Sequence, residues 1–333
     1  MMAKCVKVPK RQGEETRKAL VLAGVNNNRL KIKSDEESVY IPIMDSLSQD
    51  ILDKIIPGLT IIDCDVGENE QSRSIEDIIG FSPSFEIVGD IAIVTEEYDR
   101  PVGEAIMKVH KTVKTVLVPL TPVSGEFRVR EFKVLCGDDR TTTRYKENGI
   151  VYDLDLSKVY FSPRMATERK RVIDQVSDME FVVDMFAGVG PFAIPIAKKA
   201  MYVMAIDKNP YAVEYMRKNI GLNKVSNIQA ICADIREVEL PQHADRVIMN
   251  LPHSAHEFLD VAFKFVRTGG IIHYYDIRDE NYIFEKIILL LREKASESEC
   301  LIEIIDKRIV RSYSPHEYNI VLDIRVTGKR SDF

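Results

Sequence analysis

Short apolar runs alternate with amphipathic stretches from about residue 181 to the end of the chain. These runs are FVVDMF, YVMAID, IQAICAD, RVIMN and GGIIHYYD. Each has the length of a buried strand, and the stretches between them have helical periodicity, so the pattern predicts a doubly wound α/β sheet with parallel strands. Residues 301–309 and 319–326 flank a turn that contains Ser314-Pro315 and are expected to add an antiparallel pair.

The first third of the chain has a different pattern of apolar and polar residues. We expect a helix over residues 16–24, short strands over 30–32 and 38–41, and an apolar strand over 59–63. A polar stretch that contains Gly67 follows and is typical of a linker.

A second small module is predicted after this linker. Its strands are expected over residues 85–94, 115–119 and 126–135, and its helix over 101–111. The chain is therefore expected to contain two smaller N-terminal α/β domains before the doubly wound sheet. The predicted division is a small domain over 1–66, a linker over 67–79, an α+β domain over 80–155 and the large α/β domain over 156–333.

Charge is unevenly distributed along the chain. The formal net charge of −6 argues against a polyanionic partner, but residues 1–33 carry nine Lys or Arg against two Glu. Residues 34–80 carry two Lys or Arg against twelve Asp or Glu, and a second basic stretch covers residues 108–146. Solvated strand faces would explain either basic stretch alone, whereas the two together favour a nucleic-acid partner.

Other features narrow the class of protein. The five cysteines lie far apart and form no C-x-x-C pair, so neither a disulfide framework nor a metal site is expected. Residues 1–11 contain no apolar core of a signal peptide, and the apolar run at 287–291 is too short to span a membrane. A cytoplasmic location without membrane association is expected.

A glycine turn marks the candidate nucleotide site. Asp184 and Phe186 precede Gly188 and Gly190 directly after the first apolar strand, and a helix is expected to begin near Ala193. Glycines allow the backbone to approach a ligand at the carboxyl end of a strand. This turn also satisfies the dinucleotide fingerprint G-x-G-x-x-A, so by itself it leaves the ligand open.

Polar residues at the ends of the following strands favour S-adenosylmethionine (SAM). Asp207 ends the second strand, where it could bind the ribose of either NAD or SAM, and Lys208 follows it. Asp234 ends the third strand and Asn250-Leu251-Pro252 the fourth. Taken together, D-x-F-A-G-x-G, D-x-N-P, A-D and N-L-P resemble the class I SAM-dependent methyltransferases. In that family the Asn of N-L-P presents its amide to the base being methylated, which suits the reading of a base edge. The alternative is a strand-end Asn that closes a turn before Pro252.

The most specific tract is Tyr160-Phe161-Ser162-Pro163-Arg164 followed by Glu168-Arg169. It resembles the Y-F-S-P-R-x-x-x-E-R signature of the tRNA (guanine-37-N1) methyltransferases of archaeal and eukaryotic type. Residues 125–131, 147–149 and 310–316 extend this resemblance. It implies methyl transfer from SAM to the guanosine 3′ of the anticodon, with the small N-terminal domain binding the tRNA body.

Guanine N1 carries a proton, so its methylation needs a base and compensation for negative charge on O6. The resemblance implies that Glu168 is the base, that Arg128 contacts O6 and that Asn250 holds the guanine; Arg130 is an alternative to Arg128. An exposed Glu168 paired with Arg164 or Arg171 is the structural alternative. Arg164 could bind the carboxylate of SAM, or a phosphate or a surface carboxylate instead. His253 and His256 lack a third metal ligand and are expected on a surface helix, with no metal bound.

The predicted cofactor contacts share a position near the glycine turn, a strand end or the signature tract. They are Arg164, Asp184, Phe186, Gly188, Gly190, Asp207, Lys208, Asp234, Asn250 and Pro252.

Two further classes of function remain open at this point, an NAD-dependent oxidoreductase and a non-catalytic RNA-binding protein. His253-Ser254-Ala255 also leave open C7-methylation of a wyosine precursor, 4-demethylwyosine, at position 37. The chain is expected to act as a monomer on tRNA and not on DNA.

Overall fold

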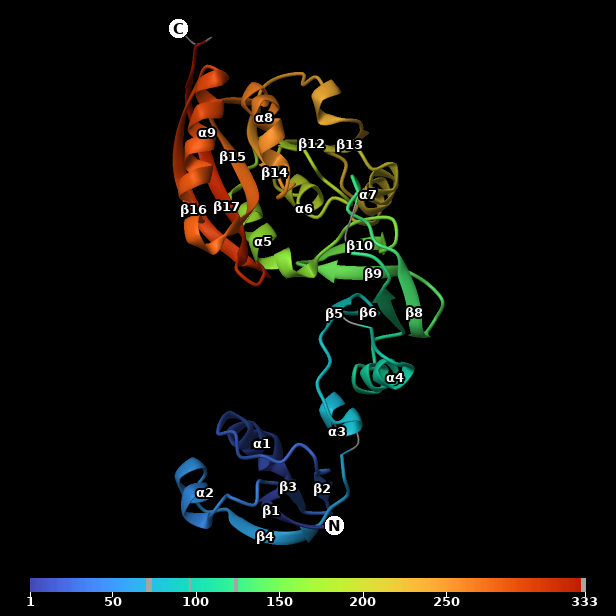
Figure 1. The fold of residues 1–333 in the computed structure, drawn as a ribbon. Helices are drawn as coiled ribbons and strands as arrows, with labels where there is room; N and C mark the ends of the chain where they lie inside the picture. Colours follow the sequence, from blue (N-terminus) through green and yellow to red (C-terminus); the bar gives the residue numbers. More distant parts are fainter. Residues whose placement is uncertain (70–73, 96, 123–124, 331–333) are drawn as a thin grey trace. The chain divides into compact units, whose positions relative to one another are not determined.

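The computed structural model describes residues 1–69, 74–95, 97–122 and 125–330. The chain forms two compact units (Figure 1). The N-terminal unit comprises Met1–Ser84 and Tyr98–Thr112, and the C-terminal unit comprises Phe85–Glu97 and Val113–Phe333. No helix in the described part of the chain is long and apolar enough to cross a membrane.

The N-terminal unit is built around a four-stranded antiparallel sheet in the order β2-β3-β1-β4. Its strands are β1 (Met2–Pro9), β2 (Lys33–Ser34), β3 (Ser38–Pro42) and β4 (Thr60–Asp65). Helices α1 (Gly13–Leu22) and α2 (Gln49–Ile55) contribute Leu20 and Leu52 to its core, where both pack with buried side chains of β1.

Strand β1 and helix α2 of this unit were not predicted. Strand β1 has buried Cys5, Val6 and Val8 between lysines, and the lysines hid its strand pattern. Helix α2 was missed as well. The strand expected over 30–32 was wrong, because Leu30 forms only an isolated bridge with Glu68.

The expected linker is structured where it is described. The carbonyl of Gly67 accepts a hydrogen bond from the Lys31 amide at 2.7 Å. The first residues of the expected linker therefore belong to the four-stranded antiparallel sheet and its helices α1 and α2, which we call the small sheet domain. Residues 70–73 of this linker lie outside the described residues. Helix α3 (Ile75–Ile79) then begins with a capping box between Ser74 and Asp77. It packs with helix α4 (Arg100–Val109), which the sequence had assigned to the second module.

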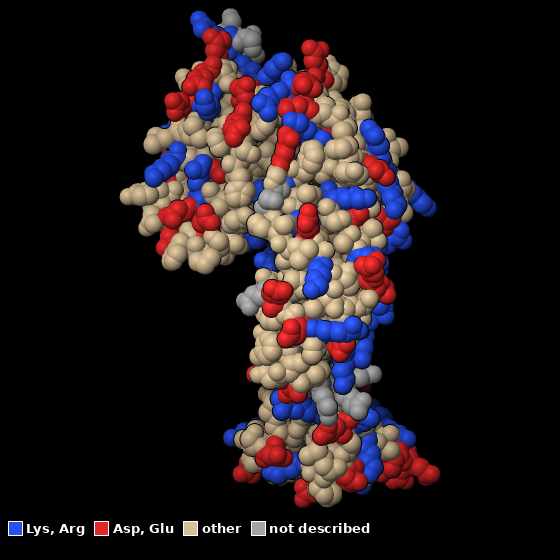
Figure 2. Space-filling view, turned by 45° about the vertical axis from the view of Figure 1, so that its right-hand side comes forward, with Lys and Arg blue, Asp and Glu red and all other residues tan. Residues whose placement is uncertain are grey.

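Charges that are separated in the sequence are mixed in this unit. β1, from the basic segment, pairs along its length with β4, from the acidic segment. The amino group of Met1 lies 2.8 Å from Asp65, and Arg29 lies 3.2 Å from Asp77. On the face shown in Figure 2, Lys and Arg are likewise interspersed with Asp and Glu.

The C-terminal unit begins with a four-stranded sheet, β5 (Phe85–Val88), β6 (Ile91–Val94), β7 (Thr115–Pro119) and β8 (Phe132–Gly137). The single strand expected over 85–94 is a hairpin that turns at Gly89, with φ of +62°. A Cβ at Gly89 would lie 2.2 Å from Thr143 Oγ1, so this turn requires glycine. The strand expected over 126–135 begins only at Phe132, because Gly125–Arg128 form a turn.

A hairpin that was not predicted joins this sheet to the rest of the unit. It consists of β9 (Thr142–Glu147) and β10 (Ile150–Asp155). Helix α7 (Pro210–Leu222) holds it through Asn219, whose Oδ1 accepts a hydrogen bond from the Asp153 amide at 2.7 Å.

The predicted doubly wound sheet is confirmed. It has seven strands in the order β13-β12-β11-β14-β15-β17-β16. The first five are parallel, and β17 pairs antiparallel with both β15 and β16. The strands are β11 (Phe181–Asp184), β12 (Tyr202–Asp207), β13 (Ile228–Cys232), β14 (Ala244–Met249), β15 (Val266–Asp279), β16 (Cys300–Ser314) and β17 (Glu317–Lys329).

Helices cover both faces of this sheet (Figure 1). On one face, α5 (Ala166–Gln175), α6 (Ala193–Ala197) and α7 pack in one apolar cluster. On the other, α8 (Leu259–Phe265) and α9 (Glu285–Glu297) pack in a second. The carboxyl ends of β11, β12 and β14 are therefore the open edge at which a ligand can bind.

Candidate active site

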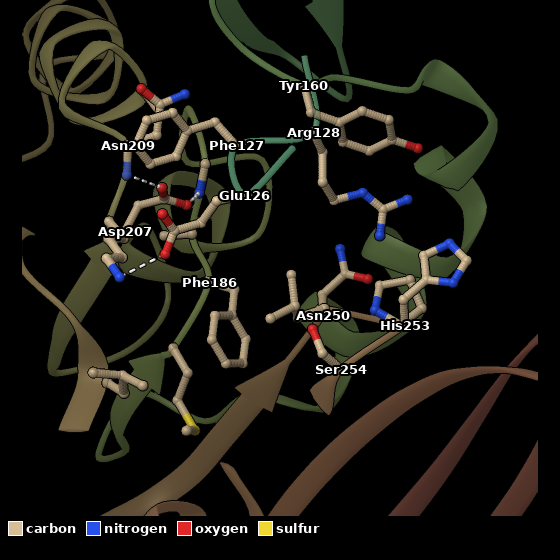
Figure 3. A pocket seen from close by; sticks show the side chains of 18 of the residues that line it. Glu126, Phe127, Arg128, Tyr160, Phe186, Asp207, Asn209, Asn250, His253 and Ser254 are labelled. Carbon is tan, nitrogen blue, oxygen red and sulfur yellow. Dashed lines mark hydrogen bonds and ion pairs between the residues drawn. The ribbon is translucent and has the colours of Figure 1, made fainter. Parts of the chain in front are cut away.

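A cavity of about 590 Å³ lies at the carboxyl ends of β11, β12 and β14. The segments after these strands line it, and so do the turn at Gly125–Arg128 and the tract at Tyr160–Ser162. Figure 3 shows Asp207, Glu126 and Phe127 on one side and Arg128, Asn250 and His253 on the other. Of the predicted site residues, those that line it are Arg128, Phe186, Gly188, Asp207, Lys208, Asp234, Asn250 and Pro252.

The glycine turn holds Asp207 at the cavity. Gly188 has φ of +54°, and a Cβ there would meet no heavy atom within 4 Å, so the turn leaves open space above its backbone. The Gly188 amide donates to Asp207 Oδ2 at 2.7 Å, and the Asn209 amide donates to Oδ1 at 2.8 Å. Burial raises the pKa of Asp207 above its ordinary value. A carboxylate has about four acceptor positions, so Asp207 can still accept hydrogen bonds from ligand hydroxyls.

Two predicted cofactor contacts lie beneath the cavity wall. Gly190 has φ of +88°, and a Cβ there would lie 2.8 Å from Ile194 Cδ1, so this glycine allows the turn to pack on α6. Asp184 is fully buried, and neither of its oxygens has a hydrogen-bond partner among the described residues. Burial, with a smaller contribution from the charge of Asp207, raises the pKa of Asp184 to about 8. Both residues support the turn and do not line the cavity.

One end of the cavity suits a flat ring and a ribose. The Phe186 ring meets Phe258 edge-on at 5.1 Å, and the Arg236 guanidinium lies 4.7 Å above the Phe258 ring. Lys208 Nζ lies 2.5 Å from Glu126 and 3.5 Å from Asp234, which orders the rim. This apolar slot beside Asp207 fits the adenosine part of SAM.

The other end of the cavity contains side chains that can form hydrogen bonds with a nucleobase. Asn250 follows β14, and the Arg128 guanidinium reaches toward it from the opposite turn (Figure 3). Arg128 has φ of +54°, which is strained for a non-glycine residue, and its guanidinium stacks 5.2 Å from the centre of the Tyr160 ring. The turn and the ring together fix the direction of this cation.

His253 is a cavity residue that the sequence interpretation placed only on a surface helix. It lies three residues after Asn250, just before the short 3-10 helix Ala255–Phe258, and lines the same end. Its Nε2 lies 3.2 Å from the Tyr313 hydroxyl. Burial and the positive charge of Arg128 lower the pKa of His253. Its place directly after N-L-P was the signal that could have identified it.

Arg311 and Asn319 were also missed. Both line the cavity, and the Arg311 Nε and Asn319 Oδ1 atoms are buried without a hydrogen-bond partner among the described residues. Arg311 belongs to a tract that resembles the family, whereas Asn319 had no signal because it occupies an ordinary strand position.

Glu168 does not line the cavity, contrary to its predicted place. It is 6% exposed on α5, where its carboxylate accepts hydrogen bonds from Arg171 and from the Tyr275 hydroxyl at 2.7 Å. The pairing with Arg171 that the sequence offered as the alternative is present, although it is buried. The next residue, Arg169, lines the cavity and is held by Glu147 Oε1 at 2.7 Å.

Arg164 is also placed outside the main cavity. Its Nε lies 3.3 Å from Glu86 Oε2, and it lines a neighbouring cavity instead. The carboxylate of Glu86 thus takes the place that the prediction gave to the carboxylate of SAM. Among the described residues, no group of three or more His, Cys, Asp or Glu is arranged to hold a metal ion.

Known proteins match this chain over nearly all of its length. The TRM5/TYW2 methyltransferase domain matches residues 143–304, the tRNA methyltransferase 5 N-terminal domain 5–51 and the TYW2 N-terminal domain 73–141. The tRNA (guanine(37)-N(1))-methyltransferase Trm5b of Pyrococcus abyssi is 41% identical over 98% of this chain and 100% of its own. The chain belongs to the TRM5/TYW2 methyltransferase family.

Two further relatives describe this family's range. The complex of aTrm5 with tRNALeu has a TM-score of 0.74 at 40% identity and covers 97% of this chain and 99% of its own. The tRNA(Phe) (4-demethylwyosine(37)-C(7)) aminocarboxypropyltransferase of Methanocaldococcus jannaschii is 39% identical over 72% of this chain and 97% of its own. Membership in the TRM5/TYW2 family makes the chain a SAM-dependent methyltransferase-fold protein and removes the NAD-dependent oxidoreductase interpretation.

Proposed function

We propose that this chain transfers a methyl group from SAM to N1 of guanosine 37 in tRNA. The observation that carries the proposal is one cavity that places Asp207 at one end and Asn250 with Arg128 at the other. SAM supplies an electrophilic methyl group when it is bound. The relatives that act on guanine 37 and match the whole chain support this substrate over the wyosine precursors.

Asn250 orients the guanine. Its amide offers both a donor and an acceptor at the cavity, which the Watson–Crick edge of guanine can satisfy together. Pro252 fixes the turn that follows Asn250, so the amide is presented from a rigid strand end. Asn250 thereby excludes rotated positions of the base in which N1 would face away from the methyl donor.

Arg128 stabilises the charge that develops on O6. When N1 loses its proton, negative charge spreads to O6, and a fixed guanidinium nearby lowers the energy of that state. The stacking on Tyr160 and the strained backbone hold this guanidinium in place before the substrate arrives. Arg130 lines only the neighbouring cavity, which favours Arg128 for this role.

The proton from N1 passes to Glu168. The family signature places a carboxylate here, and the α5 N-terminus that carries Glu168 also carries Arg169 on the cavity wall. Because Arg171 and Tyr275 occupy the carboxylate, Glu168 must exchange one of these partners for the guanine when the RNA binds. Catalytic hydrogen bonds often form only in the substrate complex. His253 is the competing acceptor, since it already lines the cavity.

The substrate is tRNA and not DNA, and the chain acts as a monomer in the cytoplasm. The small sheet domain, which the tRNA methyltransferase 5 N-terminal domain matches, binds the tRNA body. Its charges are mixed, so binding there rests on shape and individual contacts more than on a continuous basic patch.

A single-turnover assay tests this function. The protein, labelled SAM and a tRNA transcript with guanosine at position 37 should give one methyl group, which mass mapping places at N1 of that nucleotide. A matched transcript with adenosine at position 37 is the control and should remain unmodified. Methylation at another position, or equal methylation of both transcripts, would overturn the proposal.

A second candidate activity is C7-methylation of 4-demethylwyosine at position 37. Ser254, a small residue beside Asn250, lines the cavity and leaves room next to the base. The same assay with tRNA that carries 4-demethylwyosine measures this activity. Methyl transfer to C7 at a rate comparable to that on guanosine would establish it, and an unmodified tricyclic base would exclude it.

A further inference from the structure

A second cavity of about 410 Å³ adjoins the active site and has no role in the function proposed above. The two cavities share six lining residues, which therefore form the wall between them. These residues are Arg128, Tyr160, Phe161, Ser162, Arg311 and Tyr313. A ligand in the second cavity would thus lie directly beside the base that is being modified.

The lining combines an apolar bed with positive charge. Val88, Ile93 and Phe132 from the four-stranded sheet contribute apolar surface. Arg130 and Arg164, with Arg128 and Arg311 from the shared wall, bring four guanidinium groups to it. Among the described residues of this lining, Glu86 supplies the one carboxylate. Such a lining favours a ligand that is both flat and anionic.

Two buried polar atoms in this lining lack partners. Glu86 Oε1 accepts no hydrogen bond from any described residue, although Oε2 pairs with Arg164 at 3.3 Å. Arg311 Nε donates to none. An unsatisfied buried acceptor or donor is costly in free energy, so groups of this kind are normally satisfied by a ligand or by water. The acceptor and the donor belong to two residues that line the same cavity, and a nucleobase or nucleotide offers partners for both.

From these features we propose that the second cavity binds the nucleotide next to guanosine 37 in the tRNA chain, with its base unstacked. The inference rests on the proposed function. Arg130 and Arg164 bind its phosphate, the apolar bed receives the base, and Glu86 Oε1 accepts a hydrogen bond from an N–H group of that base. Consecutive nucleotides share one phosphate, so two cavities divided by the Arg128 and Arg311 wall suit two neighbours of one strand. With guanosine 37 in one cavity and its neighbour in the other, the two bases could not stack on each other, which would help to keep guanosine 37 out of the RNA stack.

The test combines a substitution in the protein with the removal of a base from the tRNA and asks whether their effects on binding affinity are additive. Three full-length tRNAs are compared in equilibrium binding: an intact one, one with an abasic nucleotide 5′ of guanosine 37, and one with an abasic nucleotide 3′ of it. Each is measured with the wild-type chain and with Glu86→Gln, which keeps the shape of the side chain. With the wild type, removal of the bound base should weaken affinity about tenfold, the scale of one base stacked in a protein site. With Glu86→Gln the same removal should weaken it distinctly less, because one contact to that base is already lost.

The two abasic tRNAs identify which neighbour is bound. The loss of affinity should depend on Glu86 for only one of them, the one that lacks the bound base. Glu303→Gln is the matched control, because Glu303 is an exposed carboxylate paired with Arg325 in the same unit. It changes the net charge equally and should leave both abasic effects unaltered. Additive effects of Glu86→Gln with both abasic tRNAs would overturn the proposal. A loss of SAM affinity in Glu86→Gln without RNA coupling would assign the cavity to the cofactor instead.

Failure of the proposed function would look different. The wild type with intact tRNA reports methylation of guanosine 37 independently of Glu86. If that reaction is absent, the proposed function fails, whereas its presence together with additive abasic effects rejects only the second cavity.

Discussion

The Arg171 guanidinium donates hydrogen bonds to Glu168, with Nε 3.1 and 3.0 Å from the two carboxylate oxygens. Arg171 also pairs with Asp323, which in turn accepts a hydrogen bond from His273 Nδ1 at 2.6 Å. Glu168 is therefore the outer member of a buried polar network that reaches across β15 and β17. The network holds the carboxylate in one orientation and makes its release part of substrate binding.

Replacing Glu168 with Gln removes the basicity of this side chain and keeps its size. If Glu168 accepts the N1 proton, the single-turnover rate should fall by about 10²–10⁴, the usual contribution of a general base. Affinities for SAM and tRNA, measured by calorimetry and filter binding, should change little. A near wild-type rate would show that a group other than Glu168 accepts the N1 proton.

His253 provides the direct comparison. Because burial and Arg128 lower the pKa of His253 from its ordinary value of 6.5, the imidazole is predominantly neutral above pH 7, and raising the pH further changes its charge little. With Glu168 as the base, His253→Asn should reduce the single-turnover rate less than about tenfold and leave its pH profile above pH 7 unchanged. A loss as large as that of Glu168→Gln would instead make His253 the acceptor.

Asp207 is expected to bind the ribose of SAM. Asp207→Ala removes the acceptor that the Gly188 and Asn209 amides hold in place, and SAM binding should weaken by about 1–3 kcal/mol. Calorimetry measures this change. Asp174→Ala, which removes an exposed carboxylate paired with Lys170, is the control and should bind SAM normally. Equal affinity in both variants would remove Asp207 from the site.

Asp184 should make the stability of the protein depend on pH. Its pKa is raised from 3.8 to about 8, so the folded chain keeps a proton that the unfolded chain releases between these values. The free energy of unfolding contributed by this group therefore falls as pH rises through that window and is constant outside it. Asp184→Asn removes this contribution.

Melting temperatures of the wild type and Asp184→Asn, measured from pH 5 to pH 9, check this expectation. The variant should gain stability relative to the wild type as pH rises toward about 8 and gain no more above it. A difference that does not vary with pH would show that Asp184 ionises normally in the folded protein.

The small sheet domain should contribute tRNA affinity and no chemistry. Residues 67–69 pair with residues 29–31, so the appropriate deletion removes residues 1–69 and not 1–66. The KM for full-length tRNA should rise, since a linked module acts through effective concentration. The SAM affinity of the truncated chain serves as the control for folding and should be unchanged. Identical kinetics with and without these residues would contradict the assignment.

The sequence by itself determined the large sheet and its glycine turn. The central strands β11 and β12 are short apolar runs that end in an aspartate, and Asn250 directly follows the apolar end of β14, so local pattern and ligand position coincide. The short strands of the smaller sheets were less visible. In β1, Lys4 and Lys7 interrupt the buried residues and hide the strand pattern. The 85–94 run is bent into a hairpin at Gly89, where a side chain would collide with Thr143, far along the chain.

Only the tertiary structure decided which members of the signature tract face the cavity. Glu168, Arg169 and Arg164 lie within six residues, yet one is tied to Arg171, one lines the active site and one pairs with Glu86 in the next cavity. Each direction depends on a charged partner from a distant strand or on the turn of a helix. Local sequence specifies residue types at these positions, but the partners that orient them meet only when the chain has folded.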